Sequence, residues 1–198
     1  MAFVVGIYGT IGSGKSTVAR ILKNKYGFYY IDGDSLAHRV YNLQEVKRDL
    51  IKLFGLQIIS KDGIILRKKI AQVVFTNPTM KNELEQLLWP KMTYMLQEVL
   101  KEETEIIIDA AALFKSHWNL LCQVTIYVET SWEKVIKRLE NRKINKEILN
   151  KIIDSQLDIV KEKNLATYQI QNNGSIQELT KKVMEIASLI QECRMKHD

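Results

Sequence analysis

Residues 9–16 have the sequence GTIGSGKS and fit the pattern G-x-x-x-x-G-K-[ST] at every position. The apolar run at residues 3–8 predicts a buried strand before this segment, and the spacing of apolar residues over 16–26 predicts a helix after it. A strand that leads through such a loop into a helix forms a nest of backbone N–H groups that binds phosphate. The segment, called here the phosphate loop, therefore predicts a nucleotide-binding α/β fold.

Individual residues of the phosphate loop have separate expected tasks. Gly12 and Gly14 allow backbone conformations that bring the main chain close to phosphate oxygens. Lys15 would reach the outer phosphates as a point charge, and Ser16 would offer its hydroxyl to Mg²⁺. We expect the nucleotide to be bound by Gly12, Ser13, Gly14, Lys15, Ser16 and Thr17.

Composition narrows the class of protein. The chain has 198 residues, of which 46% are hydrophobic and 26% charged, and this predicts one ordinary globular domain. No apolar run approaches the ~20 residues that cross a bilayer. Its two cysteines have no metal-binding spacing, which favours a reduced, cytoplasmic protein with no membrane partner. The net charge of +6 comes mostly from lysines spread along predicted helices, and this favours an anionic small substrate over nucleic acid.

Predicted strands and helices alternate along the chain, and this pattern predicts a parallel sheet flanked by helices. The further strands are expected at 28–31, 105–109, 124–128 and 168–171. The further helices are expected at 35–41, 45–54, 67–75, 78–101, 132–141, 146–164 and 176–194. Pro90 should kink or restart the long helix in which it lies.

Two carboxylates, Asp32 and Asp34, follow the second predicted strand. Ligands of open α/β sheets bind beyond the carboxyl ends of strands, so both residues would face the nucleotide site. A carboxylate there can orient an acceptor hydroxyl and take its proton, or it can contact Mg²⁺. The alternative is an Asx-type turn in which one Asp caps the following helix.

Two more features suit phosphoryl transfer. Asp109 ends an apolar strand, which is typical of the carboxylate that assists Mg²⁺ in phosphate-loop proteins; the alternative is an exposed strand end. Arg138 and Arg142 lie four residues apart, hence on one helix face, and a polar break follows them. They could close over the γ-phosphate as part of a lid, or they could be an ordinary exposed pair.

No N-K-x-D guanine-reading motif is present, and the chain is short for a motor ATPase, so a small phosphotransferase is favoured. The chain resembles the dephospho-coenzyme A kinase family. The resemblance rests on the opening segment and on several motifs farther along the chain. They are residues 5–19, the D-x-D of Asp32 and Asp34, the D-G-x-x-x-R of 62–67, Leu84-Glu85 with Pro90, 109–114, Arg138 with Arg142, Gln156, and Asn172 with Gly174.

The resemblance implies transfer of the ATP γ-phosphate to the ribose 3′-hydroxyl of dephospho-CoA, which gives coenzyme A and ADP. It implies a phosphate-loop kinase fold with a five-stranded parallel sheet in one domain, 1–198, with a helical substrate-binding insert over 62–103 and a lid over 138–155. The cofactors would be ATP and Mg²⁺, with no nucleic-acid partner, in a monomer or weak homo-oligomer. The alternatives are another small-molecule or nucleoside monophosphate kinase of this fold and a nucleotide-dependent nucleic-acid-binding protein.

Residue roles follow from the same resemblance. Asp34 takes the base position and also binds substrate, together with Arg67. Lys15 and Arg142 complete the catalytic set, Ser16 and Asp109 the metal set, and Arg138 and Asn172 join the nucleotide-binding residues. The sequence departs from the family pattern at Trp89, Lys115, Ile152 and Thr167, where the family has His, an acidic residue, Arg and Asp. The phosphate loop and D-x-D are intact, so the activity is expected to persist.

Overall fold

The computed structural model describes residues 2–140 and 156–195. The chain forms two compact units. One unit combines the residues before Asp34 with those after Val99, and Asp34–Val99 forms the other. In the described parts of the chain, no helix is both long enough and apolar enough to cross a membrane.

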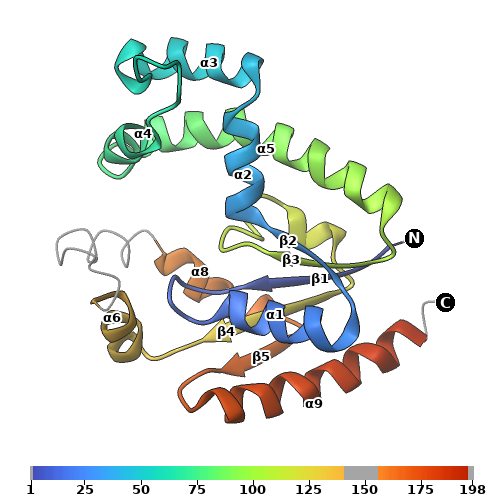
Figure 1. Cartoon of the computed structure of the whole chain (residues 1–198). Helices are drawn as coiled ribbons and strands as arrows, with labels where there is room; N and C mark the ends of the chain where they lie inside the picture. Colours follow the sequence, from blue (N-terminus) through green and yellow to red (C-terminus); the bar gives the residue numbers. More distant parts are fainter. Residues whose placement is uncertain (1, 141–155, 196–198) are drawn as a thin grey trace. The chain divides into compact units, whose positions relative to one another are not determined.

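The first unit is built on a sheet of five parallel strands in the order β2-β3-β1-β4-β5 (Figure 1). The strands are β1 (Phe3–Tyr8), β2 (Tyr29–Asp32), β3 (Glu105–Asp109), β4 (Val124–Glu129) and β5 (Tyr168–Gln171). The predicted five-stranded parallel sheet is thus confirmed. Because β1 pairs with β3 on one side and with β4 on the other, its carboxyl end lies where ligands of such sheets bind.

Helices α1 (Lys15–Tyr26) and α9 (Ile176–Met195) pack against each other on one side of this sheet (Figure 1). Their apolar residues, such as Leu22 and Val183, join Val5 and Ile7 in one core. All of β1 is buried, which explains why it reads as a continuous apolar run. The core therefore holds rigid the strand that leads into the phosphate loop.

Within the described residues of this unit, the remaining elements are short. They are η2 (Trp118–Leu121), α6 (Trp132–Glu140), α8 (Leu157–Lys161) and η3 (Glu162–Leu165). A single helix was predicted over 146–164, and its described part contains α8 followed by a 3₁₀ turn instead. The residues of the proposed lid from 141 to 155, including Arg142 and Ile152, lie outside the described part of the chain.

The second unit is helical. The chain enters it through α2 (Gly33–Tyr41), continues through α3 (Gln44–Phe54), η1 (Leu56–Ile58) and α4 (Arg67–Val74), and leaves along α5 (Pro78–Glu102). A kink or a restart was predicted at Pro90, and the restart does not occur, because α5 is one continuous helix. Loss of one backbone donor at Pro90 is tolerated, because Leu88 and Met92 on either side of it belong to a continuous buried stripe. The insert expected over 62–103 lies almost wholly in this unit, which also includes α3.

Candidate active site

The phosphate loop links the end of β1 to the start of α1, and its shape depends on glycine. Gly9 and Gly14 have φ values of 144° and 103°, which other residues rarely adopt. A side chain at Gly14 would collide with the amide nitrogen of Asn172, and one at Gly9 would collide with the backbone oxygen of Val128. Both positions therefore combine an unusual conformation with a close approach.

Helix α1 begins at Lys15, directly after Gly14. Among the described residues, no side chain caps this helix, and no acidic residue lies in its first turn. The positive end of the helix dipole is thus directed toward the loop, and no carboxylate in the first turn of α1 itself neutralises it. The Lys15 Nζ donates a hydrogen bond to the Thr10 carbonyl oxygen at 3.1 Å, so the cation lies against the loop.

Three side chains from distant segments, Thr130, Arg138 and Asn172, bond carbonyl groups of the phosphate loop, and we call them the loop clasp. The Nη1 atom of Arg138 donates to the Gly12 carbonyl oxygen at 2.7 Å. The Asn172 amide and the Thr130 hydroxyl donate to the Ser13 carbonyl oxygen at 2.7 and 2.9 Å. These contacts fix the loop's carbonyl groups on one side.

The three clasp residues also contact one another. Arg138 donates from Nη2 to the Asn172 carbonyl oxygen at 3.1 Å, and its Nη1 lies 3.3 Å from the Thr130 hydroxyl. Thr130 and Asn172 are both buried. The guanidinium of Arg138 is thus half-buried and bonded to backbone, which disagrees with the alternative of an exposed surface arginine at this position.

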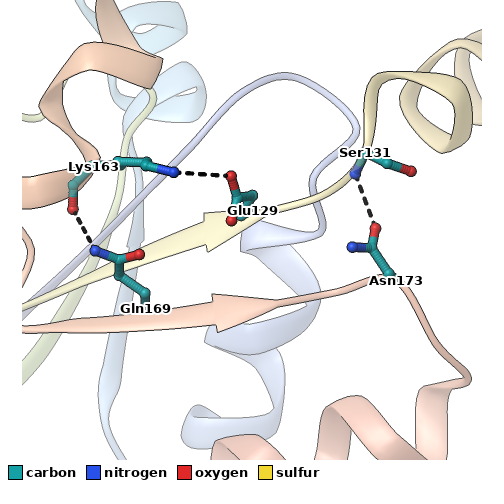
Figure 2. A network of polar contacts seen from close by, with 5 residues as sticks. All are labelled: Glu129, Ser131, Lys163, Gln169 and Asn173. Carbon is teal, nitrogen blue, oxygen red and sulfur yellow. Dashed lines mark hydrogen bonds and ion pairs between the residues drawn. The ribbon is translucent and has the colours of Figure 1, made fainter.

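The loops that carry the clasp are tied together beyond the carboxyl ends of β4 and β5. The backbone nitrogen of Asn172 donates to the Glu129 carbonyl oxygen at 2.7 Å. Figure 2 shows the Ser131 backbone nitrogen donating to the Asn173 side-chain oxygen, a bond of 2.9 Å. In the same view Lys163 pairs with Glu129 at 3.5 Å. The bond from Gln169 to the Lys163 carbonyl oxygen, at 3.1 Å, completes this network (Figure 2).

The phosphate loop has a further contact, with Gln156, that the sequence motifs did not predict. The side-chain oxygen of Gln156 accepts a hydrogen bond from the Ile11 backbone nitrogen at 2.7 Å. Gln156 carried part of the family resemblance but no expected role. Thr130 was missed altogether, because a lone threonine after a strand has the same appearance as an ordinary helix-capping residue.

The start of α1 also meets the carboxyl end of β3. Asp109 is 4% exposed, and its carboxylate is hydrogen-bonded to the side chain of Ser16 and to the Tyr30 hydroxyl, the latter at 3.0 Å. Burial raises the pKa of Asp109, while the bonds to Ser16 and Tyr30 and the charge of Lys15 oppose the rise. Asp32 lies in register with Asp109 across β2 and β3.

This corner offers the donors that Mg²⁺ prefers. Among the described residues no group of three acidic, histidine or cysteine side chains could hold a metal by itself. Mg²⁺ usually needs only one or two protein oxygens, with waters and substrate phosphates completing its coordination. The adjacent hydroxyl of Ser16 and carboxylate of Asp109 fit that requirement.

The expected substrate-side residues, Asp34 and Arg67, belong to the helical unit. Asp34 is exposed in the first turn of α2, two residues after Asp32 ends β2. Arg67 begins α4, where its Nη1 lies 2.6 Å from the His38 Nδ1 and its guanidinium lies 5.2 Å from the centre of the Tyr41 ring. The ring and the imidazole hold this cation at the start of the helix.

The described departures from the family pattern lie in varied places. Thr167 exchanges two hydrogen bonds with Thr125, from backbone to side chain in each direction, at 3.0 and 3.1 Å. Thr125 lies near the amino end of β4, whereas Thr130 follows its carboxyl end, so Thr167 has a structural role away from the phosphate loop. Trp89 is half-buried on α5, and Lys115 is exposed.

Comparison with known proteins agrees with this architecture. Residues 3–178 match the sequence model of a family described as dephospho-CoA kinase. A curated dephospho-CoA kinase from Fusobacterium nucleatum is 34% identical over 190 residues, covering 94% of this chain and 98% of its own. The solved structure of a Thermus thermophilus protein has a TM-score of 0.80 at 26% identity, covering 94% of this chain and 97% of the other. A dephospho-CoA kinase structure from Campylobacter jejuni has a TM-score of 0.67 at 25% identity, with coverages of 97% and 98%.

Proposed function

The chain belongs to the dephospho-CoA kinase family, and we propose that its phosphate loop and the residues around it carry out that family's ATP-dependent phosphorylation of dephospho-CoA. The observation that supports this assignment best is the phosphate loop itself. It leads into the uncapped start of α1, beside the paired oxygens of Ser16 and Asp109.

The loop and α1 would bind the triphosphate of ATP. Backbone amides and the helix dipole stabilise the phosphate charges, and Lys15 neutralises charge that develops on the transferred group. Ser16 and Asp109 would hold Mg²⁺, which would supply positive charge to stabilise the phosphates when it is bound. The loop clasp bonds the carbonyl groups of the loop and so holds its backbone amides in place for the phosphates. The side chains of Arg138 and Asn172 would also contact the nucleotide.

Asp34 would bind the acceptor. We assign it to orient the ribose 3′-hydroxyl of dephospho-CoA and to accept its proton as the oxygen attacks the γ-phosphate. Its position two residues after Asp32, at the end of a strand beside β3, supports this role. Arg67 would bind an anionic group of the same substrate, and Arg142 would act on the phosphoryl group.

The substrates proposed here are two small molecules, ATP and dephospho-CoA, and no nucleic acid takes part. A reaction in the cytoplasm, by a monomer or a weak homo-oligomer, agrees with the family's metabolic role.

The test is a coupled ADP-release assay with dephospho-CoA, with nucleoside monophosphates, and without any acceptor. We expect ADP release to require dephospho-CoA, and mass spectrometry with fragmentation to place the new phosphate on the 3′-oxygen. ADP release with adenosine monophosphate but not with dephospho-CoA would instead indicate a nucleoside monophosphate kinase. Salt-sensitive binding of an oligonucleotide, with no phosphoryl transfer, would support the nucleic-acid alternative.

A further inference from the structure

We propose that Tyr30 is a positioning residue for the magnesium pair, holding the Asp109 carboxylate so that it and Ser16 face the same ion. This inference rests on the proposed binding of Mg²⁺ by Ser16 and Asp109. No motif in the sequence singles out Tyr30, and neither the phosphate loop nor the D-x-D includes it.

The contact geometry supports a specific role for the phenol. The Tyr30 hydroxyl donates to the Oδ2 atom of Asp109 at 3.0 Å. The side chain of Ser16 influences the pKa of both Asp109 and Tyr30. The three oxygen-bearing groups therefore lie close together, with the Tyr30–Asp109 bond as the direct contact among them.

The parallel register explains how Tyr30 reaches this position. Tyr30 is paired with Ile107 across β2 and β3, and Asp109 lies two residues farther along β3 on the same face. The aromatic ring of Tyr30 packs against the core of the sheet, and the Lys23 Nζ lies 5.9 Å from its centre. A half-buried ring fixed on a strand directs its hydroxyl more precisely than a loop residue would.

The Asp109 carboxylate can accept the hydrogen bond from Tyr30 and still bind a cation. A carboxylate has about four acceptor positions, so Tyr30 can occupy one at Oδ2 and leave others for a cation and its waters. A tyrosine hydroxyl is a neutral hydrogen-bond donor at ordinary assay pH, so Tyr30 needs no change of protonation to hold the carboxylate. Groups that orient a metal's ligands in this way typically change metal affinity by about 10- to 100-fold.

A purely structural role for Tyr30 is the competing explanation, and Tyr30→Phe separates the two because it keeps the ring. Tyr29→Phe is the matched control, since Tyr29 is the preceding residue of β2 and is exposed on the opposite face. The measurements are Mn²⁺ binding by electron paramagnetic resonance in the presence of a non-hydrolysable ATP analogue, binding of that analogue in EDTA, and the melting temperature.

We expect Tyr30→Phe to weaken Mn²⁺ binding by about 10-fold, the low end for such groups, while analogue binding in EDTA stays within twofold. Tyr29→Phe should change neither. Unchanged Mn²⁺ binding in Tyr30→Phe, or an equal loss of analogue binding in EDTA, would overturn the inference and leave Tyr30 as a packing residue.

Asp109→Asn distinguishes failure of this inference from failure of the proposed metal site. If Asp109→Asn weakens Mn²⁺ binding and Tyr30→Phe does not, the metal site stands and the role of Tyr30 is refuted. If neither variant changes Mn²⁺ binding, the assignment of Asp109 to the metal is refuted first, and the role of Tyr30 is refuted with it.

Discussion

Arg138 donates a hydrogen bond of 2.7 Å to the carbonyl oxygen of Gly12, joining positions that are 126 residues apart in the sequence. The guanidinium has a planar set of donors, and it uses two of its nitrogens to contact the loop and the segment after β5 together. This bond makes the conformation of the phosphate loop depend on the second half of the chain.

Arg138→Lys should therefore weaken ATP binding even though it keeps the positive charge. A lysine ammonium cannot bond the Gly12 and Asn172 carbonyl oxygens with the same fork geometry. We expect the KM for ATP to rise about tenfold, equal to about 1.4 kcal/mol, with the KM for dephospho-CoA within twofold. Arg194→Lys is the control, because Arg194 pairs with Glu105 at the amino end of β3. Equal effects of the two variants would contradict a role specific to the clasp.

Thr130→Val tests the hydroxyl of the clasp. The variant keeps the side-chain shape but removes the donor to the Ser13 carbonyl oxygen, so we expect weaker ATP binding by about tenfold and a loss of about 1–3 kcal/mol in the free energy of unfolding. Thr125→Val is the matched control, since both threonines are 8% exposed and Thr125 bonds Thr167 instead. Its stability should fall similarly while ATP affinity stays within twofold. Isothermal titration and chemical denaturation provide both values.

Lys15→Ala should reduce turnover by at least about 10²–10³-fold, the range for removal of a group that stabilises transition-state charge. The melting temperature should change little, because Lys15 is only half-buried and does not belong to the apolar core. Lys25→Ala, in the last turn of the same helix, is the control and should keep normal turnover. A folded Lys15→Ala enzyme with near-normal turnover would remove the catalytic role of the loop lysine.

Asp34→Asn and Asp32→Asn together distinguish the two carboxylates. Asparagine keeps the size of the side chain but cannot accept the hydroxyl proton, so Asp34→Asn should lower turnover by about 10²–10⁴-fold, with ATP affinity unchanged. The loss belongs at the low end of that range if the transition state is loose and positioning outweighs proton removal. A much larger effect of Asp32→Asn would exchange their roles. Normal turnover in both variants would show that Asp32 and Asp34 only form a turn and take no part in the reaction.

Cys122 should resist alkylation in the folded protein. Burial raises the pKa of its thiol to about 12, and its sulfur lies 3.3 Å from the Trp118 carbonyl oxygen. At pH 8 the thiolate fraction is then about 10⁻⁴. The rate of labelling should rise about tenfold for each unit by which the pH is increased, until the pH reaches that pKa. Mass spectrometry of a Cys193→Ser variant treated with iodoacetamide checks this expectation. Rapid labelling at pH 8 before unfolding would contradict it.

Sequence patterns predicted most of the fold because the three central strands, β1, β3 and β4, are almost fully buried. Strands β1 and β3 have the predicted bounds, since both are continuous apolar runs of the kind found inside parallel sheets. The edge strand β5 also has the predicted bounds, although of its residues only Ile170 is buried. Of the kink or restart predicted at Pro90, the restart does not occur, because local backbone preference is weaker than a buried apolar stripe along α5. In the described part of the helix predicted over 146–164, the helix α8 gives way to a 3₁₀ turn, a distinction that periodicity alone does not make.

Site residues were predicted where a motif spans consecutive residues, where a carboxylate ends an apolar strand, or where the family resemblance supplied them, as for Asn172. The phosphate loop and the D-x-D are local patterns, so the sequence identified them directly. Thr130 and Tyr30 contribute single hydroxyl groups, and their partners Ser13 and Asp109 are 117 and 79 residues away. Such contacts depend on the strand order and register, which no window of the sequence contains.

The loop clasp also bears on how the chain is made. The phosphate loop leaves the ribosome among the first segments, yet its Ser13 carbonyl oxygen is bonded by Asn172, which is translated 159 residues later. A nascent chain that has not yet released β5 lacks this support, as well as the edge strand of the sheet. We therefore expect nucleotide binding to strengthen once Asn172 has been translated and β5 has joined the sheet, so that ATP stabilises chains of that length more than shorter ones.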